Sequence, residues 1–195
     1  MLAEPGAPGR YAREILANAP LDKGRLRIHH LRYLPHLEHI RHRRVVLLSC
    51  DQTEPVDDLH IMTEIDHLNS ISAHATGGTI DLKALTAARE LAIVSIYCAG
   101  RYKNAASLRR IPHLRYLALR TTEPGAWRSI DFLGNCPRLD FLWLDNLQQV
   151  RDYTSLQPLT NLTTVWLDDA TQLTDLDPIG QLGDLLSLSL SRSNI

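Results

Sequence analysis

The sequence predicts an α/β solenoid, a stack of similar units that each contribute a short strand and a helical return. An LxxLxL pattern begins at Leu139, Leu162 and Leu185, so that successive copies are 23 residues apart. Self-similarity at a fixed period of this length is typical of stacked-repeat architectures. The chain has 195 residues and 44% hydrophobic content. That suffices for the core of one ordinary domain or one elongated array.

Weaker copies of the pattern precede these three. Counting back from Leu139 in steps of 23 residues, with one step of 25, places further first positions at Leu114, Leu91, Leu68 and Val45. The longer step reflects a two-residue insertion within 121–126, where Pro124 and Gly125 are typical of an inserted turn. The pattern therefore predicts about seven repeats over residues 45–195, the last of them incomplete.

The second half of each unit is periodic as well, with apolar residues three apart, for example Leu173, Leu176, Ile179 and Leu182. Residues three apart share one face of a 3₁₀ turn or a short, tight helix. Stacking then places the leucines of successive units in one core and pairs the strands in a parallel sheet. Strands lie about 4.8 Å apart and the returns are wider, so we expect a curved sheet on the concave side and the returns on the convex side.

These units resemble the leucine-rich-repeat family, and most nearly its short, internalin-like bacterial repeats. The resemblance rests on LxxLxL together with the segments 153–162 (YTSLQPLTNL) and 175–185 (DLDPIGQLGDL), and it covers about residues 45–195. It implies a leucine-rich-repeat solenoid and a role in protein recognition. The family's asparagine at repeat position 9 is absent, so its hydrogen-bonded asparagine ladder cannot be carried over to this chain. Residues such as Thr122, Leu147 and Ala170 stand at that position instead.

Residues 1–44 are expected to form a helix and an irregular capping repeat, which covers the apolar end of the array. The segment 23–44 contains seven Lys and Arg residues and a single Glu. The HxxHxxH spacing of His36, His39 and His42, near His29 and His30, leaves metal binding as a weaker alternative. Nucleic acid is not the expected partner, because phosphate-binding clusters usually carry more lysine and a recognisable module.

The carboxyl end differs from a capped array. The chain stops at Ile195, eleven residues into the seventh unit, without a polar capping segment. We expect either a truncated chain or an end covered by another chain, including self-association through the open repeat.

The charge is distributed unevenly along the chain. The segment from Asp131 to Asp184 contains nine aspartates and two arginines, so its net charge is negative, whereas that of segment 23–44 is positive.

The strand positions that face away from the core are the candidate binding positions. Leucines at positions 4 and 6 point inward, so side chains at positions 3, 5 and 7 point outward by the period-two alternation of a strand. Across the units, position 5 reads Ser49, Ser72, Ser95, Ala118, Trp143, Trp166 and Ser189. Three neighbouring strands gather aromatic and charged side chains, which have the composition of a binding hot spot. The candidate partner-binding residues are Tyr97, Tyr116, Arg120, Phe141, Trp143, Asp145, Trp166 and Asp168. The alternative is that Trp143 and Trp166 form a stabilising cross-strand pair.

Catalysis is not expected. The motifs GxxxxGK[ST], GxGxxG, HExxH and GxSxG are all absent, so we predict no catalytic residue, no cofactor and no metal. The three cysteines, Cys50, Cys98 and Cys136, are few and far apart, which favours reduced thiols. No apolar segment predicts a membrane span or a secretory signal, and we expect a cytoplasmic, bacterial protein without a membrane partner.

The predicted function is non-catalytic protein–protein recognition through the concave face. The alternative is a detached sensor region that resembles the repeat tails of bacterial NACHT-type signalling NTPases, with the catalytic module upstream or on another polypeptide.

Overall fold

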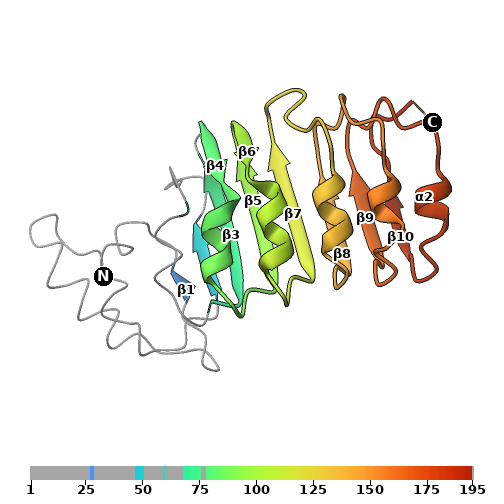
Figure 1. The fold of residues 1–195 in the computed structure, drawn as a ribbon. Coiled ribbons are helices and arrows are strands. Elements are labelled where there is room, and N and C mark those ends of the chain that lie inside the picture. Colours follow the sequence, from blue (N-terminus) through green and yellow to red (C-terminus); the bar gives the residue numbers. More distant parts are fainter. Residues whose placement is uncertain (1–26, 29–46, 51–58, 60–67, 76–77, 195) are drawn as a thin grey trace, which may run out of the picture.

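The computed structural model describes residues 27–28, 47–50, 59, 68–75 and 78–194, and the fold is given for these residues. Figure 1 shows a row of parallel strands with helical segments lying along one face of the row. The predicted amino-terminal helix and the histidine segment 29–42 lie outside the described residues.

One eight-stranded sheet runs through the array. Its strands are all parallel, in the order β1-β2-β3-β5-β7-β8-β9-β10. They are β1 (Arg27–Ile28), β2 (Leu47–Cys50), β3 (Ser70–Ala75), β5 (Ile93–Cys98), β7 (Tyr116–Thr121), β8 (Phe141–Leu144), β9 (Thr164–Leu167) and β10 (Ser187–Ser189). The sheet thus begins within the segment expected to form the cap, because β1 pairs with β2.

The strand register matches the repeat positions derived from the sequence. Leu142 pairs with Val165, and Val165 with Leu188, so that position 4 of one unit lies beside position 4 of the next. The pairing of Leu117 with Leu142 shows the same register across the two-residue insertion. The insertion is therefore absorbed by the loop after β7, which rises above the neighbouring turns in Figure 1.

Short helical returns connect the strands and cover one face of the sheet (Figure 1). Within the described residues, four are 3₁₀ helices and one is a single α-helical turn: η3 (Leu82–Ala87), η4 (Ala105–Arg110), η5 (Asp131–Asn135), η6 (Thr154–Leu156) and α2 (Asp177–Gly180). The three-residue spacing has a direct physical basis. Leu159 N–H donates to Leu156 O and Leu162 N–H donates to Leu159 O, both at 3.0 Å, so consecutive tight turns place each apolar side chain on the same side.

A second, two-stranded parallel sheet was not predicted. Strands β4 (Thr79–Asp81) and β6 (Arg101–Lys103) pair with each other just before η3 and η4. The two backbone segments that precede these strands approach closely at this point. A Cβ atom on Gly100 would lie 2.0 Å from the carbonyl oxygen of Gly78, so glycine is required there.

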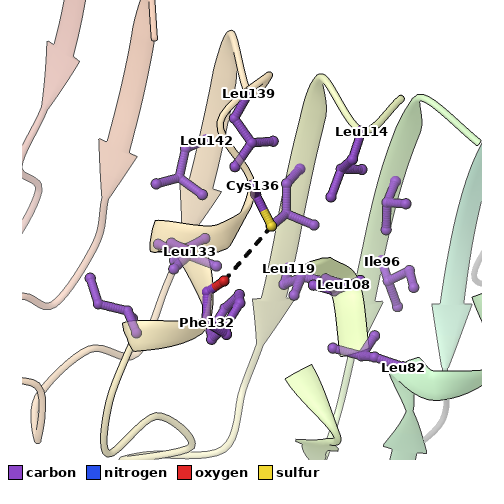
Figure 2. Packing of buried hydrophobic residues seen from close by; sticks show 14 of the residues in the cluster. Leu82, Ile96, Leu108, Leu114, Leu119, Phe132, Leu133, Cys136, Leu139 and Leu142 are labelled. Atoms are coloured by element: carbon purple, nitrogen blue, oxygen red, sulfur yellow. Dashed lines mark hydrogen bonds between the residues drawn. The ribbon is translucent and has the colours of Figure 1, made fainter. Parts of the chain in front are cut away.

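The core is a continuous layer between the sheet and the returns. Inward side chains of β8 and β9, such as Leu142, Leu144 and Leu167, have no exposed area. Figure 2 shows the return residues Phe132, Leu133 and Cys136 packed toward strand leucines of the same layer. Cys98, at a repeat position that we did not assign to the core, is also fully buried. The last unit is less covered, since Leu188 is 43% exposed.

We expect Leu142→Ala to lower the free energy of unfolding by about 2–5 kcal/mol, because the cavity that it leaves is enclosed on both sides by packed units. Leu186→Ala removes a side chain that is 87% exposed and is expected to change the free energy by about 0.5 kcal/mol or less. Urea denaturation followed by circular dichroism measures both variants. Equal effects would contradict the assigned core.

We expect Gly100→Ala to destabilise the protein by about 1–3 kcal/mol, because the new methyl group meets backbone that cannot move aside without breaking the β4–β6 pairing. Gly183→Ala is the control, since a Cβ there meets no atom within 4 Å. Thermal unfolding of the two variants compares the sites. A Gly100 variant as stable as the Gly183 variant would show that the close approach does not constrain the fold.

Candidate functional site

The sheet face opposite the helical returns holds the candidate binding residues. Seven of the eight predicted residues form one continuous set of contacts on this face, which we call the aromatic strip. Its members come from β5, β7, β8 and β9 and from the residue that follows β9. They are Tyr97, Tyr116, Arg120, Phe141, Trp143, Trp166 and Asp168. All seven are half-buried.

Aromatic rings form the centre of the strip. Tyr116 and Phe141 stack in parallel on neighbouring strands, with centroids 4.1 Å apart and an interplanar angle of 6°. Trp166 presents an edge-to-face geometry to two rings, at 5.4 Å from Phe141 and 4.9 Å from Trp143. Such pairs stabilise by about 0.5–1.5 kcal/mol each beyond the area that they bury. The rings therefore hold one another in place.

Arg120 joins the aromatic rings of β5 and β8. Its Cζ atom lies 4.0 Å from the centroid of Trp143 and 5.5 Å from that of Tyr97. Both distances are within the range of a cation–π interaction. The Arg120 Nε atom also lies 3.8 Å from Asp145 Oδ2. The guanidinium is thus fixed between two rings and a carboxylate.

Asp145 is placed differently from our expectation. It was predicted to point out from the strand face at position 7, but the residue is only 7% exposed. Its Oδ1 atom accepts a 2.6 Å hydrogen bond from Thr121 N–H at the end of β7. Strand β8 ends at Leu144, so the alternation of an extended chain no longer governs the direction of the Asp145 side chain. Asp145 therefore contacts Arg120 of the strip as a buried group and is not an exposed member of it.

The environment of Asp145 alters its acidity. Burial raises the pKa of Asp145 to about 6, while the Thr121 N–H and the Arg120 guanidinium act in the opposite direction. The nearby Asp168 carboxylate contributes a further rise in this pKa. Because burial outweighs these favourable contacts, ionising the Asp145 carboxyl costs stability in the folded protein.

Asp168 keeps a carboxylate on the strip. Its Oδ2 atom accepts a hydrogen bond from Trp143 Nε1 at 3.2 Å, which fixes the indole orientation. Among the residues that the structure describes, no Lys, Arg or His lies within ion-pair distance of Asp168. The adjacent Asp169, by contrast, pairs with Arg192 at 2.9 Å.

Two further residues extend the strip and were not among the predicted site residues. His74 on β3 lies against Tyr97 with centroids 5.2 Å apart. Ile93 pairs in register with Tyr116 and is 38% exposed. Both occupy outward positions, 7 and 3, of the same repeat pattern. The register that located the aromatic residues was therefore sufficient to find them.

Comparison with solved structures identifies the architecture. An internalin, InlF, from Listeria monocytogenes matches with a TM-score of 0.62 and 20% identity, over 84% of this chain and 46% of that one. Internalin C2 from the same species matches with a TM-score of 0.57 and 18% identity, over 84% of this chain and 76% of that one. The chain has the leucine-rich-repeat fold.

A more distant match is the leucine-rich-repeat ectodomain of the receptor kinase GASSHO1/SCHENGEN3 from Arabidopsis thaliana, solved in complex with CASPARIAN STRIP INTEGRITY FACTOR 2. It has a TM-score of 0.54 and 14% identity, over 80% of this chain and 19% of that one. The present chain spans about half the length of the InlF chain that it matches. No family model matches the chain, and no curated protein does either.

A polar hollow of about 560 Å³ lies at the edge where the strands of the leucine-rich-repeat array begin. It is lined by Arg115, Arg138, Asp140, Asn161 and Thr163. Its groups bind one another: Arg115 Nη2 lies 2.6 Å from Asp140 Oδ2, and Thr163 Oγ1 donates to Asp140 O at 3.0 Å. These contacts form a surface network, without a nucleophile next to a general base.

Among the described residues, the remaining chemistry-bearing side chains do not form a cluster. Cys98 and Cys136 are free and buried, and burial raises the pKa of Cys136 to about 11, which disfavours a reactive thiolate. Within the described residues, no group of three or more His, Cys, Asp or Glu side chains is arranged to hold a metal ion. In the same part of the chain, no helix is long and apolar enough to span a membrane.

We expect Asp145→Asn to remove part of the pH dependence of stability. The folded protein holds the Asp145 proton more tightly than the unfolded chain, whose Asp pKa is about 3.9. The contribution of Asp145 to the free energy of unfolding therefore falls as pH rises from about 4 to about 6, by about 3 kcal/mol at most. Chemical denaturation across this range should give a flatter profile for the variant.

The control for this experiment is Asp152→Asn. Hydrogen bonds from Thr154 lower the pKa of Asp152, so its contribution is lost only as pH falls below about 4. Its profile above that pH should match that of the parent protein. If the free energy of unfolding of the Asp145 variant fell as steeply as that of the parent protein between about pH 4 and pH 6, the raised pKa assigned to Asp145 would be wrong.

Proposed function

We propose that this leucine-rich-repeat array binds a protein partner through its strand face, centred on the aromatic strip, and makes or breaks no covalent bond. The observation that carries the proposal is a set of four half-exposed aromatic rings held against one another on adjacent strands, which Arg120 joins to a fifth ring, Tyr97. Rigid, partly exposed aromatic side chains lose little conformational freedom on binding and are enriched at binding hot spots.

The core is complete without these rings. Below them, Leu142, Val165 and Leu167 are already fully buried. Tryptophan is also not needed at position 5 for the sheet to form, since Ser72 and Ser95 occupy the same register in β3 and β5. Cross-strand stacking explains how the rings are held, but it does not explain why large rings stand at the surface of an already filled core.

The class of partner is supported by the architecture. The plant ectodomain of the same fold was solved in complex with CASPARIAN STRIP INTEGRITY FACTOR 2, and we propose a protein or peptide partner for this chain as well. The free thiols of Cys98 and Cys136 fit a reducing compartment, and we propose the cytoplasm. A sensor region of a NACHT-type protein would use the same surface, so the experiment below bears equally on that alternative.

The test uses a double variant, Trp143→Ser with Trp166→Ser, which places at both sites the residue found at position 5 of neighbouring units. Peptides that bind the parent protein are selected from a yeast-displayed library of random dodecapeptides and are then titrated against the variant. We expect their affinity for the variant to fall by about tenfold or more, because the main apolar anchors are removed.

A matched control replaces two exposed apolar residues away from the strip, Leu176→Ser with Leu186→Ser. This control should bind the peptides as the parent does. Thermal unfolding of both double variants separates binding from folding. Peptide affinity that survives loss of the tryptophans, or a variant that no longer folds while its single substitutions bind normally, would overturn the proposal in favour of a stabilising pair.

A further inference from the structure

We infer that the carboxyl-terminal end of the aromatic strip, formed by Trp166 and Asp168, binds a Lys or Arg side chain of an extended peptide segment in the partner. This inference rests on the proposed function and specifies the chemistry of the partner. It depends on the balance of charge along the strip and on the shape of the sheet face beyond β9.

The two charged groups of the strip are not equivalent. The Arg120 cation is compensated, because Asp145 lies 3.8 Å from its Nε atom and the Trp143 ring lies 4.0 Å from its Cζ atom. Asp168 receives only the neutral Trp143 N–H as a side-chain partner among the described residues. The strip therefore carries one negative charge without a cation, next to an aromatic ring.

The nearest cation on the carboxyl-terminal side is already engaged. Arg192 follows β10 in the chain, and its Nε atom lies 2.9 Å from Asp169 Oδ1. That pair leaves Asp168 without an internal counter-ion. A cation supplied by a partner would therefore meet an unpaired carboxylate without having to displace an existing ion pair.

The surface beside Trp166 and Asp168 is open to an incoming chain. Ser189 of β10 pairs in register with Trp166. The neighbouring outward positions are Ser187 and Ser191, both exposed, and Ser189 and Ser191 lie with their hydroxyls 3.2 Å apart. The three serines lie beside the larger Trp166 and Asp168 of the preceding unit. Trp166 and Asp168 therefore stand higher on the sheet face than the serines that follow them.

A carboxylate beside an indole ring suits a cationic side chain. The ring attracts the cation through its quadrupole, and the carboxylate adds a charge-assisted hydrogen bond. A guanidinium or ammonium group also brings an aliphatic stem that packs along the ring. A divalent metal ion would instead need several oxygen ligands, whereas the carboxylates near Asp168 are already engaged, Asp145 with Thr121 N–H and Arg120 and Asp169 with Arg192.

The surrounding charge favours the same class of partner. Nine aspartates and two arginines lie between Asp131 and Asp184. Charges of one sign attract an oppositely charged segment during the approach and raise its association rate. The selectivity for the strip comes from the local pair of Trp166 and Asp168, and the wider acidic region acts only on the approach.

The experiment extends the peptide selection. Dodecapeptides that bind the parent protein, and that lose binding to the Trp143→Ser/Trp166→Ser variant, are sequenced. We expect Lys and Arg to be enriched in these peptides relative to the unselected library. The peptides are then titrated against Asp168→Asn, which keeps an oxygen acceptor for Trp143 Nε1 but removes the charge.

The matched control is Asp131→Asn, which removes the same charge from an exposed residue in η5 on the return face. At about 0.15 M salt, we expect Asp168→Asn to weaken peptide binding about fivefold or more and Asp131→Asn less than about twofold. Trp-dependent peptides without Lys or Arg enrichment, or equal losses in the two Asn variants, would overturn this inference and leave the proposed function standing. If no selected peptide depends on the tryptophans, both fall together.

Discussion

The structure depends on one constraint, the stacking of inward side chains in a common register. No single unit can bury its own leucines, because a strand and a short return have too little surface to enclose them. Stacking completes the core only if equivalent positions meet, as Leu117, Leu142 and Val165 do in consecutive strands. The same register brings every outward residue beside its counterpart in the next unit, so the core and the outward strand face are fixed together.

The aromatic strip follows from that register and from a small number of supporting contacts. Outward positions of successive strands lie within reach of one another, which places Tyr116 on Phe141 and Trp143 against Trp166. Beneath them, Asp145 holds the end of β7 through Thr121 N–H and approaches Arg120. The Tyr102 hydroxyl lies 2.6 Å from Arg120 O and 2.8 Å from Ile96 O, which ties the same strand to the core.

Much of this arrangement could be predicted from the sequence, because a period of 23 residues determines both strand register and the direction of side chains. The parallel sheet, the 3₁₀ returns and the position of the insertion are confirmed. The period does not specify what happens where the chain stops being extended. Asp145 lies one residue past the end of β8 and is buried against the end of β7, and Cys98 is buried at a position that the pattern left outside the core. The β4–β6 pair was missed for a related reason, since it forms between residues that the pattern treats as connections.

That second pair of strands also gives the array two different mechanical regions. Around β4 and β6 consecutive units are joined by a second backbone ladder in addition to the large sheet, whereas the later returns are joined by packing and by single side-chain hydrogen bonds, such as that from Ser155 Oγ to Ile130 O at 3.1 Å. Two ladders resist bending more than one, because bending must stretch the hydrogen bonds on one of them. The stretch near β3 and β5 should therefore resist bending, and the part that carries Trp143 and Trp166 should change its curvature more easily.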